Sequence, residues 1–148
     1  MESSMRRAGI TIASLALVVG LAAPAHADLA EFLRGLNVQA KADIHGFTLK
    51  VAAQFGVGEA QVQAVIRSTE TPADAFMCFQ LGQMAHKQPD VVLEAIKAGK
   101  GKGWGAIAQR LGIAPGSAEF KALKDGDLVL TGEPGAKAGK AKGKGPKK

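Results

Sequence analysis

The chain has 148 residues, which is enough for one domain and too short for two of ordinary size. Hydrophobic residues make up 47% of it, so the composition is globular rather than disordered, yet only 5% are aromatic and tyrosine is absent. The core must therefore be built mainly from aliphatic side chains. The meaning of the net charge of +6 depends on where the charges lie.

The first 27 residues have the pattern of a secretory signal peptide. Arg6 and Arg7 precede an uncharged apolar run over about residues 10–21, and Ala25-His26-Ala27 supplies an A-x-A cleavage site. The apolar run is short for a bilayer span, and the residues after the paired arginines fit a twin-arginine signal poorly. We therefore expect cleavage that leaves Asp28 first, and a periplasmic or secreted protein without a transmembrane span.

The basic charge is concentrated at the two ends of the chain. Residues 28–131 contain eleven basic and eleven acidic residues, so this part is neutral. Residues 132–148 contain only Gly, Ala, Lys, Pro and one Glu, a composition without apolar periodicity that predicts disorder. The predicted organisation is a signal peptide over 1–27, a helical domain over 28–131 and a basic tail over 132–148. The tail lysines are Lys137, Lys140, Lys142, Lys144, Lys147 and Lys148.

The first half of the predicted domain combines two patterns. Residues 28–34 favour a short helical turn with Asp28 as its N-cap. Residues 36–43 alternate between apolar and polar, which predicts a half-buried strand, although their alanines and lysine also suit a helix. Residues 44–55 follow helical spacing up to Gly56, and residues 59–68 predict a second helix.

The second half predicts four more helices. The first runs from Pro72 to about Lys87, with Thr71 as N-cap. It is apolar on almost every side, which places it in the middle of the core. The others are expected over residues 89–98, from Trp104 to Gly112, and over 118–124 with Ser117 as N-cap.

Residues 127–131 alternate like a strand, and their only evident partner is the segment 36–42. The predicted fold class is therefore mainly α: a compact bundle of five to six short helices with a small two-stranded pairing of the mature N-terminal and C-terminal segments.

The glycine-rich run 99–105 contains the only tryptophan and precedes a helix. Backbone amides at such a place attract anions, but no lysine here precedes Ser or Thr as a Walker loop requires, and no strand precedes the run as in a dinucleotide fingerprint. We interpret the run as a close connection between two helices, with Trp104 anchoring it to the core. A ligand- or metal-binding site that uses Lys100, Lys102 and Trp104 is the alternative.

Other candidate chemistries have less support. Residues 106–124 resemble a helix-turn-helix, but the second helix is very short and the surrounding region is neutral, which disfavours specific nucleic-acid binding. His45 and His86 lie in different helices without nearby ligands. Cys78 is expected to be a buried small hydrophobe; an exposed Cys78 would instead bridge two chains. No catalytic constellation stands out, so we predict no enzyme activity, cofactor or metal site.

Two stretches resemble a group of small exported bacterial proteins without an assigned function. Residues 101–120 carry a GKGWG…A…LGI.PGS.EF signature, and Pro72-Ala73-Asp74 is a second point of similarity. Many such sequences have lysine and histidine where this chain has Ala114 and Lys121. The resemblance implies export and supplies no catalytic residues.

Taken with the charge pattern, these observations predict a small, non-enzymatic, exported binding or interaction module. Lysines near an anionic membrane contribute about 1 kcal/mol each, screened by salt. The tail would therefore contact an anionic envelope polymer, a lipid surface or a protein partner. A tail that only improves solubility is the alternative.

Overall fold

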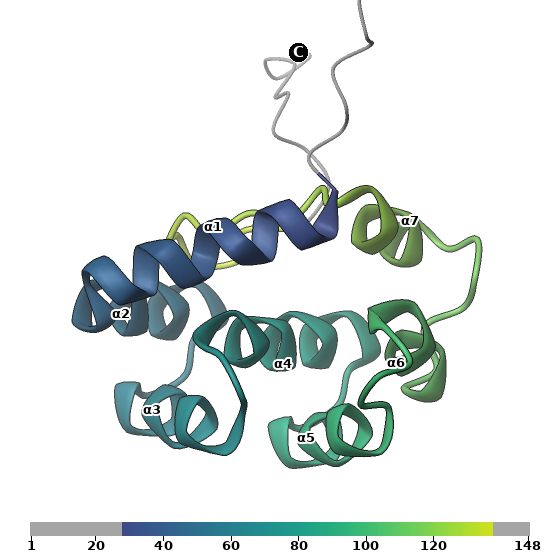
Figure 1. Cartoon of the computed structure of the whole chain (residues 1–148), viewed down its shortest axis with the longest axis horizontal. Helices are drawn as coiled ribbons and strands as arrows, with labels where there is room; N and C mark the ends of the chain where they lie inside the picture. The colour runs from purple at the N-terminus through teal and green to yellow at the C-terminus, as the bar shows by residue number, and fades with distance from the viewer. Residues whose placement is uncertain (1–27, 138–148) are drawn as a thin grey trace, which may run out of the picture.

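The computed structural model describes residues 28–137, and within them the chain is mainly α-helical, with seven helices and no strand. The helices pack around α4, with α1 crossing one side of it and α3 and α5 lying on the other (Figure 1). Their bounds are α1 Leu29–Ala42, α2 Ile44–Phe55, α3 Glu59–Ser68, α4 Pro72–Ala85, α5 Pro89–Ala98, α6 Trp104–Arg110 and α7 Ala118–Asp125.

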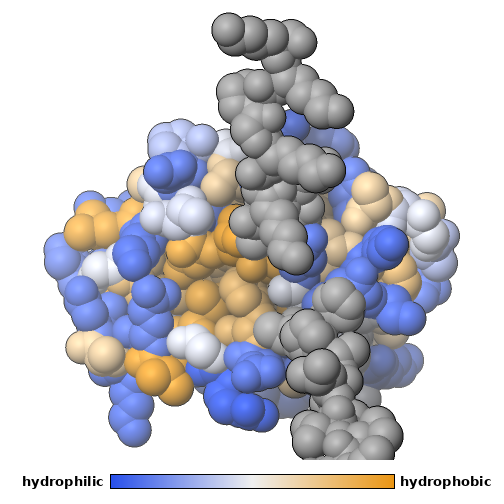
Figure 2. Space-filling model, turned by 90° about the horizontal axis from the view of Figure 1, so that it is seen from above, coloured by the Kyte–Doolittle hydropathy of each residue, from blue (hydrophilic) through white to orange (hydrophobic). Residues whose placement is uncertain are grey.

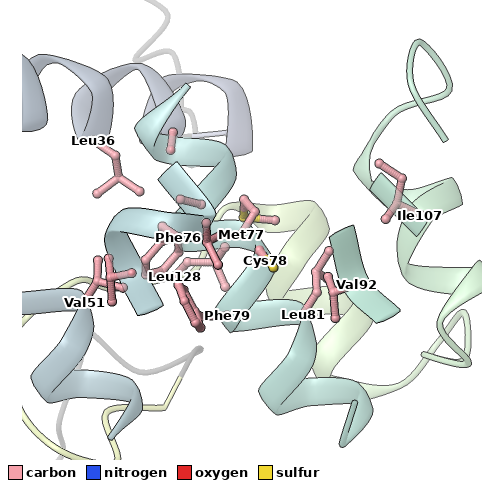
Figure 3. Close-up of a cluster of buried hydrophobic side chains, with 14 of the residues drawn as sticks. Leu36, Val51, Phe76, Met77, Cys78, Phe79, Leu81, Val92, Ile107 and Leu128 are labelled. Atoms are coloured by element: carbon pink, nitrogen blue, oxygen red, sulfur yellow. The ribbon is translucent and has the colours of Figure 1, made fainter. Parts of the chain in front are cut away.

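The central position predicted for the Pro72 helix is confirmed. Every residue of α4 from Ala75 to Gly82 is buried, and side chains from neighbouring helices converge on it (Figure 3). Its start is fixed by a capping box: the Thr71 hydroxyl accepts from the Asp74 N–H at 3.2 Å, and the Asp74 carboxylate accepts from the Thr71 N–H at 3.0 Å. The sequence therefore fixes both where this helix begins and why it lies in the core.

The strand predicted over residues 36–43 is wrong, because residues 29–42 form the single helix α1. The apparent alternation includes Val38, which is 66% exposed, whereas Leu36 and Ala40, four residues apart on one helix face, are buried. Asp28 caps α1 by accepting from the Glu31 N–H at 2.9 Å. The alanines and lysine of this stretch thus follow their helical preference.

The predicted strand over residues 127–131 is also wrong, and with it the two-stranded pairing. We call residues 127–137 the C-terminal strap; it contains no strand, and residues 134–135 form a turn. Its polar groups bind the side chain of Gln54 in α2 instead. Gln54 Nε2 donates to the Val129 carbonyl at 2.8 Å, and Gln54 Oε1 accepts from the Thr131 N–H at 2.9 Å. The Gln54 side chain therefore makes the backbone hydrogen bonds that a partner strand would have made.

The remaining helices lie close to their predicted bounds. Gly56 ends α2 in the left-handed conformation, Gly99 follows α5, and the Ser117 hydroxyl caps α7 by accepting from the Phe120 N–H at 3.1 Å. Between residues 28 and 137, no helix is long and apolar enough to cross a membrane. Figure 2 shows apolar surface gathered in the middle of the upper face, with hydrophilic side chains around it.

Candidate functional site

The Gly99–Trp104 turn is a tight connection between α5 and α6. The Gly99 N–H donates to the Ala95 carbonyl at 2.9 Å, and the Lys102 N–H donates to the Gly99 carbonyl at 2.9 Å. The second of these bonds closes a four-residue turn over residues 99–102. The third residue of this turn, Gly101, has a φ of 82°, as a type II turn requires. A Cβ on Gly99 would lie 2.4 Å from Ile107 Cγ1, so this position needs a glycine for close approach. The turn therefore has structural reasons for its glycines.

A cavity of about 410 Å³ lies between this turn and the α3–α4 connection. Lys100 reaches across it to form an ion pair with Glu70, which sits just before the cap of α4. The hydrogen bond to Glu70, followed by its charge, raises the pKa of Lys100 above its ordinary value. Because both side chains are mostly exposed, the pair contributes little to stability.

Trp104, the first residue of α6, lines both the cavity and a neighbouring groove. It lines the cavity beside Lys100, and it also lines an apolar groove of about 810 Å³ formed with the start of α1 and with α7. The indole is partly buried and packs against the core, as its predicted anchoring role requires. Lys102 is exposed and outside both sets of lining residues. The structure thus brings together Lys100 and Trp104 but not Lys102.

The root of the basic tail is attached to α2. Besides its two bonds to Val129 and Thr131, Gln54 Oε1 accepts from the Gly132 N–H at 3.3 Å, and the Gln54 backbone carbonyl accepts from the Gly135 N–H at 3.2 Å. Lys137, two residues further on, is exposed and lines a cleft between α4 and α7. The other predicted tail residues lie outside the described residues: Lys140, Lys142, Lys144, Lys147 and Lys148.

Three residues that the sequence did not single out contribute to these sites. Gln54 and Gln80 are both 2% exposed, and both lie on helices whose other buried side chains are mostly apolar. Glu70 gives no signal in the sequence beyond its place before a capping box. The two glutamines could have been found in the sequence as polar residues at inward helical positions. A buried amide without a hydrogen bond lowers stability, so such a residue indicates a specific partner.

The titratable side chains offer little further chemistry. Cys78 is buried, as predicted, and its thiol donates to the Pro89 carbonyl at 3.4 Å. Burial, with a smaller effect of Asp90, raises the pKa of this thiol to about 12. His45 and His86 are exposed. Among residues 28–137, no three His, Cys, Asp or Glu side chains lie close enough together to hold a metal ion.

The described residues thus present three features: a cavity crossed by an ion pair, an apolar groove, and a strap bonded to α2 just before the lysine-rich segment. In comparisons with known proteins, no family model, no curated protein and no solved structure matches the chain.

Proposed function

We propose that this chain is an exported, non-enzymatic binding module that attaches to anionic envelope surfaces through its basic tail. Export is supported by the signal pattern over residues 1–27. The capping residue of α1 is Asp28, the residue that predicted cleavage makes first.

The observation that carries the proposal is the position of the net positive charge, which lies after residue 131 in the sequence. Residues 28–131 have equal numbers of acidic and basic residues, whereas six lysines and one glutamate follow. The last hydrogen bond between the strap and Gln54 is at Gly135, just before the first of these lysines. A positive segment attached at a fixed point on a neutral domain can bind an anionic surface without disturbing the helices.

Co-sedimentation with vesicles tests this proposal. The chain from Asp28 to Lys148 should bind vesicles that contain one third phosphatidylglycerol and should not bind vesicles of phosphatidylcholine alone. Binding should weaken steeply as salt is raised, because screening shortens the reach of the charges. The matched variant replaces the six tail lysines with glutamine, which keeps the length and leaves Gln54 and the strap intact.

The proposal predicts that the glutamine variant stays in the supernatant while its thermal unfolding is unchanged. Equal sedimentation of both proteins, or sedimentation that does not depend on salt, would refute a role for the tail.

A second candidate function is ligand binding at the Gly99–Trp104 turn. It is favoured by the cavity of about 410 Å³ there and by the Lys100–Glu70 pair, which an anion could open by competing for the lysine. Titration of Trp104 fluorescence with phosphate, acetate and divalent metals tests it. A saturable change that disappears in Lys100→Gln supports the site, and a flat response to all of these probes rules it out.

A further inference from the structure

A cleft of about 840 Å³ separates the C-terminal part of α4 from α7 and the strap. Its inner wall includes Gln80 and Met84 from α4 and Ala122 from α7. Charged residues of both signs line it as well, among them Glu119, Lys121 and Lys137. None of its lining residues belongs to the cavity at the Gly99–Trp104 turn, so the two places are separate.

Gln80 is the unusual member of this wall. Gln80 is only 2% exposed, and its buried Oε1 has no hydrogen-bond partner among the residues that the structure describes. An unpaired buried acceptor costs free energy, which a donor arriving in the cleft would recover. The terminal torsion of glutamine is broad, so the carboxamide can turn its oxygen toward such a donor.

Gln54 shows how a buried glutamine acts in this molecule when its partner is present. Its carboxamide accepts from the backbone N–H groups of Thr131 and Gly132 and donates to the carbonyl of Val129. Both ends of the amide are thus used on one short stretch of non-helical backbone, and neighbouring Leu128 is buried in the core. Gln80 has the same burial and also lies within a helix, but no backbone stretch within residues 28–137 bonds to its Oε1.

We propose that the cleft binds an extended peptide segment with aliphatic side chains, held by its backbone on Gln80 as the strap is held on Gln54. A backbone N–H of the peptide donates to Gln80 Oε1. An aliphatic side chain of the peptide packs against Met84 and Ala122, where the wall is apolar. Because the charges around the cleft are of both signs, uncharged peptides fit this site better than strongly charged ones. This inference does not depend on the function proposed for the tail or for the Gly99–Trp104 turn, although the tail residue Lys137 lies at the edge of the cleft.

Isothermal titration calorimetry with two blocked pentapeptides tests the inference. The probes are acetylated, amidated peptides that alternate Thr with Leu or Thr with Val, and the protein is the chain from Asp28 to Lys148. Each control peptide has the same side chains but N-methylated central amides, which removes the donors. The matched protein variants are Gln80→Leu in the cleft and Gln63→Leu on the exposed face of α3.

At least one probe should bind, and its affinity should fall roughly ten- to a hundredfold in Gln80→Leu or on N-methylation, as expected when one buried hydrogen bond is lost. Gln63→Leu should bind like the original protein. Thermal unfolding of Gln80→Leu should be no less cooperative than that of the original chain, which separates loss of the site from loss of the fold. Absence of binding by both probes at millimolar concentration, or binding that ignores both N-methylation and Gln80→Leu, would overturn the inference.

Discussion

At the scale of single residues, two buried glutamines have opposite effects on stability. Gln54 satisfies three backbone groups of the strap, so its burial is compensated. The Oε1 of Gln80 is buried without compensation. The same residue type therefore stabilises the fold in one helix and destabilises it in the other, and substitution by a hydrophobic residue of similar size should separate the two cases.

Gln54→Leu should lower the free energy of unfolding by about 1–3 kcal/mol, because it leaves strap N–H groups and a carbonyl without partners. Gln80→Leu should leave it unchanged or raise it, because the substitution removes a buried acceptor that bonds to nothing. Urea unfolding followed by circular dichroism measures both. Equal destabilisation by the two substitutions would contradict this account.

Gly99→Ala should destabilise the protein by about 1–3 kcal/mol, since the added Cβ would meet Ile107 Cγ1 at 2.4 Å and the Ala95 carbonyl oxygen at 3.1 Å. The matched control is Gly35→Ala in α1, where the added Cβ meets nothing within 4 Å. That control should stabilise by about 0.5–1 kcal/mol through helix propensity. Urea midpoints at constant slope give both values, and a neutral Gly99→Ala would argue against close approach at the turn.

The buried thiol of Cys78 makes stability depend on pH in the alkaline range. Its pKa is raised from an ordinary value of 9.0 to about 12, so the unfolded chain ionises first as the pH rises. The contribution of the neutral thiol is fully present below pH 9.0 and is lost progressively up to about pH 12. Between pH 8.5 and pH 10.5, roughly, the free energy of unfolding should fall more steeply for the original chain than for Cys78→Ala. Identical slopes would show that Cys78 titrates normally in the fold.

At the scale of elements, the sequence predicts helices well where caps and periodicity agree. α4 has Thr71, Pro72 and Asp74 at its start and an apolar surface throughout, and both its position and its central role are confirmed. In α1 the sequence predicts a strand in place of a helix, because Leu36, Val38 and Ala40 alternate with polar residues. Periodicity 2 and periodicity 3.6 coincide over so short a stretch, and only the burial of Leu36 and Ala40 against α4 decides between them.

The candidate sites were less predictable than the helices. Lys100 and Trp104 were expected from the glycine-rich run, but Glu70 comes from a segment thirty residues away and meets Lys100 only through packing. Gln54 meets the strap across more than seventy residues in the same way. Such pairings depend on how the helices lie relative to one another, which local patterns in a single sequence do not reveal.

The capping box of α4 gives a prediction at this scale. Thr71→Ala removes the acceptor for the Asp74 N–H and should lower the free energy of unfolding by about 0.5–2 kcal/mol. Thr71→Ser keeps the hydroxyl and should recover most of this loss. Thermal unfolding of the two variants side by side measures the difference. If Thr71→Ser is as unstable as Thr71→Ala, the methyl group rather than the cap is responsible.

At the scale of the whole molecule, the strap packs on the helices, and the first residues of the predicted basic tail belong to it. Leu128 is 5% exposed and lies among the core side chains near α4 (Figure 3). Leu130 also packs against the core, and Gln54 holds the strap as far as Gly135. Hydrogen bonds between the strap and α2 therefore continue to Gly135, four residues beyond residue 131.

Two truncations separate these roles. A chain that ends at Ala136 keeps every strap contact with Gln54, so it should unfold at the same urea concentration as the full chain. A chain that ends at Gly126 loses Leu128 from the core and leaves its site open, which should cost about 3 kcal/mol or more, as for other buried leucines. It should also bind a dye for exposed apolar surface in the absence of urea. If ending the chain at Gly126 and at Ala136 has the same effect on stability, the strap does not belong to the cooperative unit, and the neutral helical domain ends at α7.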